Sequence, residues 1–128
     1  MPPNCDLTLG LTCADKSSPG RSVWIMRADE RFANPTGAVQ GGFLAAMADS
    51  AMGACAVSSV APRRVRVSNT DLRVSFLRPV AVGDRLTCTA TTLRAGRSVV
   101  TVRAEIENAR GELVATASSS YVVRERHG

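Results

Sequence analysis

One acid inside a long apolar segment is the feature of this chain with the clearest chemical meaning. The segment from Gly42 to Val57 is rich in alanine and methionine, and its polar side chains are Asp49 and Ser50. A helix that is apolar all round is normally buried, and a carboxylate within it is costly unless another group pairs it or a reaction uses it. Just before the helix, Gly41-Gly42 offer bare backbone N–H groups at the positive end of the helix dipole. An acid on one side of a cleft and an N–H donor on the other suit acyl transfer.

The periodicity of apolar residues predicts the elements that position these groups. Residues 42–58 predict one long helix, which Pro62 ends. After Pro62, apolar and polar residues alternate, which is typical of half-buried strands. Strands are predicted at residues 22–27, 71–78, 86–93, 98–107 and 114–123. Because the connections are short, we expect consecutive strands after the helix to pair as antiparallel hairpins.

This order of elements indicates an α+β domain, in which an antiparallel sheet of five or six strands wraps around one long, central, buried helix. We assign residues 21–126 to this single domain. Residues 1–20, rich in Pro, Ser and Gly, form a loosely specified lead-in with a short helix near residues 7–13. The polar loop before the helix and the ends of the sheet need cover, which a second subunit would give.

Charge and aromatic content argue against a nucleic-acid-binding protein. The net charge is +5, from 16 Lys and Arg against 11 Asp and Glu, but the arginines are scattered along the chain. One Trp, one Tyr and three Phe leave little aromatic surface on which bases could stack. A few arginines that contact an anionic small molecule are the alternative to a solvated basic surface.

Cysteine and histidine content argues against a metal site. The four cysteines lie far apart, and the one histidine is His127, so clustered zinc ligands are lacking. The N-terminus lacks the pattern of a signal peptide, and the apolar segment, interrupted by Asp49, falls short of the roughly 18 residues that span a bilayer. We therefore expect a cytoplasmic protein without a membrane partner.

Three motifs together are far more specific than any one of them. They are residues 34–42 (NPTGAVQGG), Asp49 eight residues after Gly41, and residues 71–79 (DLRVSFLRP). With these motifs, residues 22–124 resemble the hotdog-fold acyl-CoA thioesterases, most closely the branch of the phenylacetate-pathway and 4-hydroxybenzoyl-CoA enzymes. The resemblance implies a hotdog fold and hydrolysis of an acyl-CoA thioester to a carboxylic acid and coenzyme A. It implies no metal and no bound cofactor, since coenzyme A arrives with the substrate.

The resemblance also implies catalytic roles for four positions. Asp49 matches the acid that activates water or attacks the thioester carbonyl directly. Gly41 matches the residue whose backbone N–H holds the thioester oxygen, and Asn34 matches the loop residue that orients the attacking group from the other subunit. Gln40 stands where many members have His, and Gln can hydrogen-bond but cannot titrate.

For substrate binding, the resemblance implies a polar residue after the helix and contacts to the phosphates of coenzyme A. Ser68, Asn69 or Thr70 would supply the first. The expected binding residues are Gly42, Asn69, Arg78, Arg97 and Ser98. The family assembles as a homodimer or a homotetramer, with the site between subunits and with Asn34 and Asp49 from different chains.

Each candidate also has a structural alternative. Asp49 could be satisfied by an Arg or by backbone donors. Gly41-Gly42 could serve close packing or a tight helix entry, and Asn34, next to Pro35, is an ordinary turn residue by composition.

Two other functions fit the same scaffold. A non-hydrolytic module that binds acyl-CoA or an aromatic ligand is favoured by Gln40 in place of His. A hydratase or dehydratase would need an Asp/His pair, for which His127 is badly placed.

Overall fold

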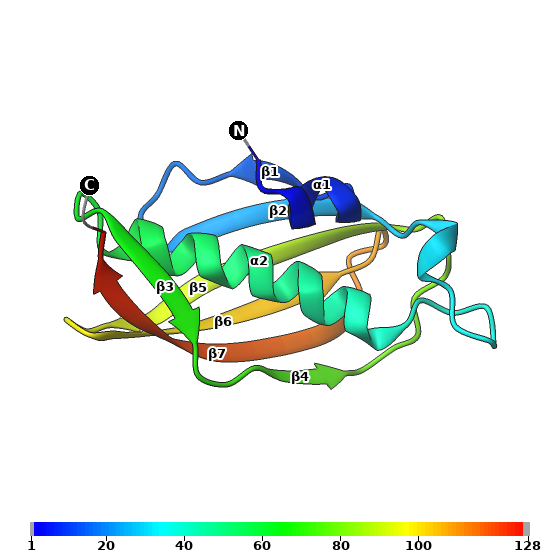
Figure 1. The fold of residues 1–128 in the computed structure, drawn as a ribbon. Helices are drawn as coiled ribbons and strands as arrows, with labels where there is room; N and C mark the ends of the chain where they lie inside the picture. The colour runs from blue at the N-terminus through cyan, green and yellow to red at the C-terminus, as the bar shows by residue number, and fades with distance from the viewer. Residues whose placement is uncertain (1, 127–128) are drawn as a thin grey trace.

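The structure, a computed structural model, describes residues 2–126 of the chain. One antiparallel sheet of seven strands curls around one long helix, α2 (Figure 1). The helical elements are α1 (Asn4–Leu9), the 3-10 turn η1 (Glu30–Phe32) and α2 (Gly41–Ser59). The strands are β1 (Thr12–Asp15), β2 (Arg21–Arg27), β3 (Val65–Asn69), β4 (Arg73–Phe76), β5 (Arg85–Ala95), β6 (Val99–Glu107) and β7 (Leu113–Glu125). The predicted α+β class is confirmed.

The strand order is β1-β2-β5-β6-β7-β3, and β4 also pairs with β7. The two hairpins β5–β6 and β6–β7 form as predicted. The predicted hairpin between the strand at 71–78 and the next strand is wrong, because β4 pairs with β7 and β5 lies between β2 and β6. The connecting residues 77–84 carry the chain across the end of the sheet, where the Val39 N–H donates to Val80 O and the Ala28 N–H donates to Asp84 O.

Helix α2 is buried on one face only, which corrects the expectation that it is buried all round. Its core face carries Leu44, Met47, Ala48, Ala51, Met52, Cys55 and Ala56, spaced three or four residues apart. Its outer face carries Asp49, Gly53 and Val57, which are half-buried or exposed. The sheet covers only one side of the helix, so the second side stays open in a single chain. By length and composition α2 could also cross a membrane, contrary to our expectation, but here it packs as a core helix.

The strand count exceeds five or six because two short strands extend the sheet. Strand β1 joins its edge beside β2, and β3 shares β7 with β4. The short helix expected near residues 7–13 lies earlier, at Asn4–Leu9, because Gly10 ends it in the left-handed conformation at φ 69°. Leu9 and Leu11 are buried, so the lead-in packs onto the domain.

Candidate active site

Asp49 lies half-buried on the outer face of α2, at the edge of a cavity of about 490 Å³. Its Oδ1 accepts a hydrogen bond from the Tyr121 hydroxyl at 2.8 Å and another from Asn69 Nδ2 at 3.0 Å. Among residues 2–126, no cation forms an ion pair with it. Gly53, Ala54, Val57 and Val67 give the cavity an apolar wall. The carboxylate is therefore oriented by neutral donors and is not neutralised by an arginine.

Tyr121 is the site residue that the sequence analysis missed. It is the one tyrosine of the chain, it lies in β7, and only 3% of its surface is exposed. Burial, and next the hydrogen bond to Asp49, raise the pKa of Tyr121 above its ordinary value, so the hydroxyl stays protonated and can donate. The available signal was a hydroxyl-bearing ring at a core-facing position of the last strand.

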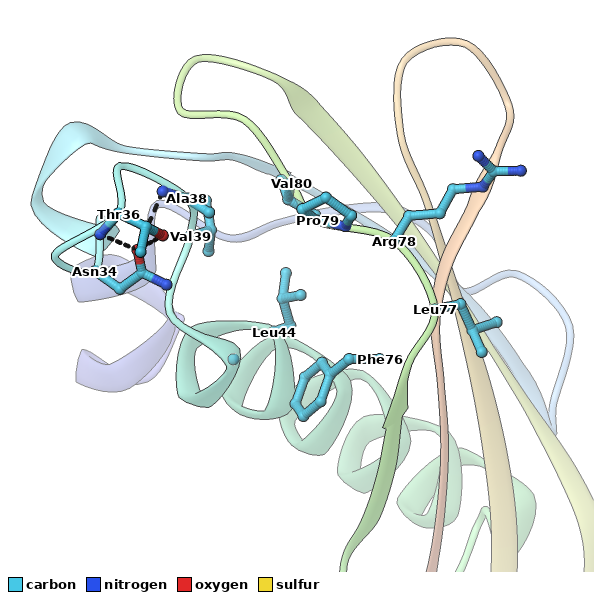
Figure 2. Close-up of a pocket in the computed structure, with 11 residues that line it drawn as sticks. Asn34, Thr36, Ala38, Val39, Leu44, Phe76, Leu77, Arg78, Pro79 and Val80 are labelled. Carbon is cyan, nitrogen blue, oxygen red and sulfur yellow. Dashed lines mark hydrogen bonds between the residues drawn. The ribbon is translucent and has the colours of Figure 1, made fainter.

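Gly41 lies at a different cavity, of about 520 Å³, at the start of α2 (Figure 2). As the first residue of the helix, it has no intrahelical acceptor for its N–H, and within the described chain neither Gly41 nor Gly42 donates to any other group. The ring of Phe76 lies over this position, and Leu44 and Val80 contribute to the wall. Gly41 thus lines this cavity with a backbone N–H that no group of the described chain accepts, and an oxyanion site requires such a free donor.

The loop before α2 holds Asn34 and Gln40. Oδ1 of Asn34 accepts from the Thr36 N–H at 2.9 Å, the Thr36 hydroxyl at 2.7 Å and the Ala38 N–H at 3.2 Å (Figure 2). These bonds close a turn, as in the structural alternative, and leave the Asn34 Nδ2 as its free polar group within residues 2–126. The Gln40 backbone is held by Phe32 and Phe43, while its side chain is exposed.

Gly41 and Asp49 are on the same helix, but they are too far apart along it to contact the same small group. Eight residues of α-helix separate them by about 12 Å along the axis, and their two cavities share no lining residue. The C=O bond of a thioester, at about 1.2 Å, is far shorter than that separation. A single chain therefore does not bring the two groups to the same carbonyl carbon.

The residues predicted to contact phosphates are also dispersed. Arg78 extends away from Leu44 and Phe76 (Figure 2), and its guanidinium lies 3.4 Å from the Glu112 carboxylate. Arg97 and Ser98 lie in the turn between β5 and β6, beyond the end of α2 opposite to Gly41 (Figure 1). There the Arg97 carbonyl accepts from Arg63 at 3.3 Å. One chain does not gather these three residues around one ligand.

The buried cysteines are unsuited to act as the nucleophile. Burial raises the pKa of the Cys88 thiol to about 12 and also raises the pKa of Cys55, which lies 3.3 Å from the Thr92 hydroxyl. At neutral pH both remain thiols, and the thiolate is the reactive form. Asp49 is thus a better candidate for the nucleophile than either buried cysteine.

A curled antiparallel sheet around a single long helix, with an acid within that helix and free amides at its start, defines a hotdog-fold protein. The family model of the thioesterase superfamily matches residues 36–115, and the chain belongs to this superfamily. The medium/long-chain acyl-CoA thioesterase YigI of Escherichia coli K12 is 34% identical over 97 residues, which cover 66% of this chain and 62% of that protein. The match thus spans less than two thirds of the relative's length.

Two solved structures show the same fold over nearly the whole chain. The E. coli PaaI protein, from the phenylacetic acid degradation operon, superposes with a TM-score of 0.84 at 26% identity, covering 97% of this chain and 84% of that one. A phenylacetic acid degradation-related protein of Ralstonia eutropha JMP134 superposes with a TM-score of 0.86 at 33% identity, covering 95% and 91%. The predicted family and fold are confirmed.

Proposed function

We propose that this protein hydrolyses an acyl-CoA thioester to a free carboxylic acid and coenzyme A. The observation that carries the proposal is the Asp49 carboxylate, which lies at an apolar cavity, is held by Tyr121 and Asn69, and is paired with no cation in the described chain. The superfamily and the acyl-CoA thioesterase relative support the reaction type.

The proposed chemistry uses Gly41 and Asp49 on the same carbonyl. The Gly41 N–H polarises the thioester oxygen and stabilises the negative charge that develops there. Acting as a base, Asp49 takes a proton from water, whose oxygen attacks the carbonyl carbon. The C–S bond then breaks, and the coenzyme A thiolate leaves and takes up a proton. Acting as a nucleophile, Asp49 instead forms a mixed anhydride, which water cleaves to give the same products.

We propose a homodimer or homotetramer in which the site lies between two chains. Because Gly41 and Asp49 lie about 12 Å apart on one helix, the Gly41 of one chain must act with the Asp49 of another. Two features support such packing: β3 is an edge strand of the sheet, and the outer face of α2 is only partly covered. A two-fold axis would create two equal sites. Asn34, through its free Nδ2, would then meet the Asp49 of the partner.

The two cavities suit an apolar acyl group. Val39, Leu44, Phe76 and Pro79 line the cavity at Gly41, and Ala54, Val57 and Val67 line the cavity at Asp49. The exposed cationic groups at the ends of the sheet, among them Arg78 and Arg97, would serve the phosphates of coenzyme A. The four free cysteines fit a reducing, cytoplasmic setting.

A thiol-release assay over a panel of acyl-CoA substrates tests the proposal. We expect turnover by the wild-type protein and a loss of about 10²- to 10⁴-fold in kcat for Asp49→Asn. Asp71→Asn is the matched control, because Asp71 accepts the Ser120 N–H through Oδ1, and an asparagine can still accept there. Wild-type turnover by Asp49→Asn would remove Asp49 from the reaction. Tight binding of acyl-CoA without any thiol release would favour the ligand-binding module instead.

A further inference from the structure

Two donors hold the same oxygen of Asp49. The Tyr121 hydroxyl lies 2.8 Å and the Asn69 Nδ2 lies 3.0 Å from Oδ1. Within residues 2–126, no hydrogen bond or ion pair reaches Oδ2. The two carboxylate oxygens of this acid are therefore not equivalent in the folded chain.

The pairing of two strands produces this arrangement. Asn69 is the last residue of β3 and is directly opposite Tyr121 in the β3–β7 register. Cross-strand partners have side chains on the same face of the sheet, and here that face is turned toward α2. The two donors thus converge on one point of the helix, and a shift of β3 on β7 by one residue would turn the Asn69 side chain to the other face of the sheet.

Tyr121 is anchored more firmly than a surface donor would be. Only 3% of the surface of Tyr121 is exposed, and its hydroxyl also lies 3.1 Å from the Asp49 carbonyl oxygen. Asn69, in contrast, is exposed. The one proton of this hydroxyl is donated to the nearer oxygen, Oδ1, and the second contact keeps the Asp49 backbone close to β7.

From this geometry, and given the proposed function, we propose that Tyr121 is a positioning residue that fixes Oδ1 of Asp49, so that Oδ2 is the oxygen that reacts. In the base route, Oδ2 takes the proton of water. In the nucleophile route, Oδ2 bonds to the carbonyl carbon. Oδ1 keeps its two donors throughout.

The first test replaces the hydroxyl alone. Tyr121→Phe keeps the buried ring and removes the donor. We expect kcat to fall about ten- to a hundredfold with KM little changed, because a hydrogen bond to a charged group is lost.

Ser22→Ala is the matched control. The Ser22 hydroxyl is buried and donates to the Ala51 carbonyl of α2 at 3.1 Å, so it ties a strand to the same helix without touching the Asp49 side chain. We expect this variant to lose stability, as Tyr121→Phe does, but to keep the wild-type kcat. A purely structural role for Tyr121 would make the two variants alike.

A second measurement leaves the fold undisturbed. Because the chain has one tyrosine, growth with 3-fluorotyrosine places a fluorine probe at Tyr121 alone. Because the Tyr121 hydroxyl lies 2.8 Å from Asp49 Oδ1, we expect its ¹⁹F resonance to shift in Asp49→Asn. A resonance that is the same in the wild-type protein and in Asp49→Asn would contradict the contact on which the proposal rests.

The outcomes separate this inference from the function on which it rests. If Asp49→Asn is inactive while Tyr121→Phe keeps the wild-type kcat, the positioning role is wrong and the thioesterase proposal stands. If Asp49→Asn is fully active, the proposed function itself loses its catalyst.

Discussion

The ring of Phe76 lies against Gly41, the first residue of α2. A Cβ atom built on Gly41 would lie 2.8 Å from Phe76 Cζ and 3.1 Å from Cε1, closer than side chains pack. Phe76 extends from β4 over the start of the helix (Figure 2), and it remains 54% exposed. A side chain at position 41 would therefore displace the Phe76 ring, so the glycine has a packing role in addition to any approach of a substrate to its N–H.

The steric and the catalytic roles of Gly41 can be separated by two substitutions in a Phe76→Leu background, which relieves the contact. Gly41→Ala keeps the N–H, and Gly41→Pro removes it. Proline suits this first helical position, and Gln40, at φ −62° and ψ 132°, already has the backbone that a following proline requires. We expect the proline variant to have a kcat about 10²- to 10³-fold below that of the alanine variant.

Rates in a thiol-release assay, with thermal unfolding of each variant, provide the comparison. Equal rates for the proline and alanine variants would leave Gly41 with a packing role only. The single variant Phe76→Leu sets the baseline against which both are measured.

The role of Arg78 can be tested against its ion-pair partner. Arg78 lies near Glu112, an exposed pair whose own contribution to stability is small. If Arg78 contacts a phosphate of coenzyme A, Arg78→Ala should raise KM several-fold at low salt and less at high salt. Glu112→Gln, which frees the same guanidinium, should leave KM equal or lower.

Michaelis constants of both variants at two salt concentrations decide the question. A KM for Arg78→Ala that equals the wild-type value at low salt would assign Arg78 to the protein surface alone. The same pair of measurements applied to Arg97→Ala tests the more distant candidate at the β5–β6 turn.

Most of the fold followed from local sequence patterns. The apolar segment predicted α2 nearly to its ends, and alternation predicted β5, β6 and β7 within two residues at each boundary. Strand β3 was missed because Val65 and Val67 are its only apolar residues, too few for a clear alternation. The pairing of β4 with β7 was missed because partner choice depends on contacts distant in sequence, which no local pattern records.

The candidate site, like the fold, was predicted only in part from the sequence. Asp49 was chosen from its type and position, and Asn69 was one of three polar residues that the family resemblance implied; the structure places Asn69 Nδ2 3.0 Å from Asp49 Oδ1. Tyr121 could not be chosen, since its contact with Asp49 depends on how β7 packs against α2, which lies 72 residues away in sequence. The contact of Phe76 with Gly41 was equally hidden, because Phe76 is 35 residues away in sequence and reaches the helix only through β4.

Finally, the shared site predicts that two inactive variants restore activity when mixed. Asp49→Asn lacks the acid, and the Gly41→Pro variant in the Phe76→Leu background lacks the amide donor. In a mixed dimer, the intact Asp49 of one chain meets the intact Gly41 of the other at one of the two sites, and the second site carries both defects. Because half of randomly mixed dimers are of this kind, and because the working site takes Gly41 with its own Phe76 from the Asp49→Asn chain, we expect about one quarter of the activity of the wild-type protein.

The experiment mixes the two variants, lets their subunits exchange under mild denaturant, and measures thiol release before and after. Each variant dimerised with itself provides the baseline, and a mixture of Asp49→Asn with Asp49→Ala controls for the exchange step, since no combination of these two holds an acid. Recovery in the first mixture alone would show that each site draws on two chains. Activity that stays at the baseline after verified exchange would contradict a shared site. Gly41 and Asp49 of one helix, about 12 Å apart, would then have no common carbonyl on which to act.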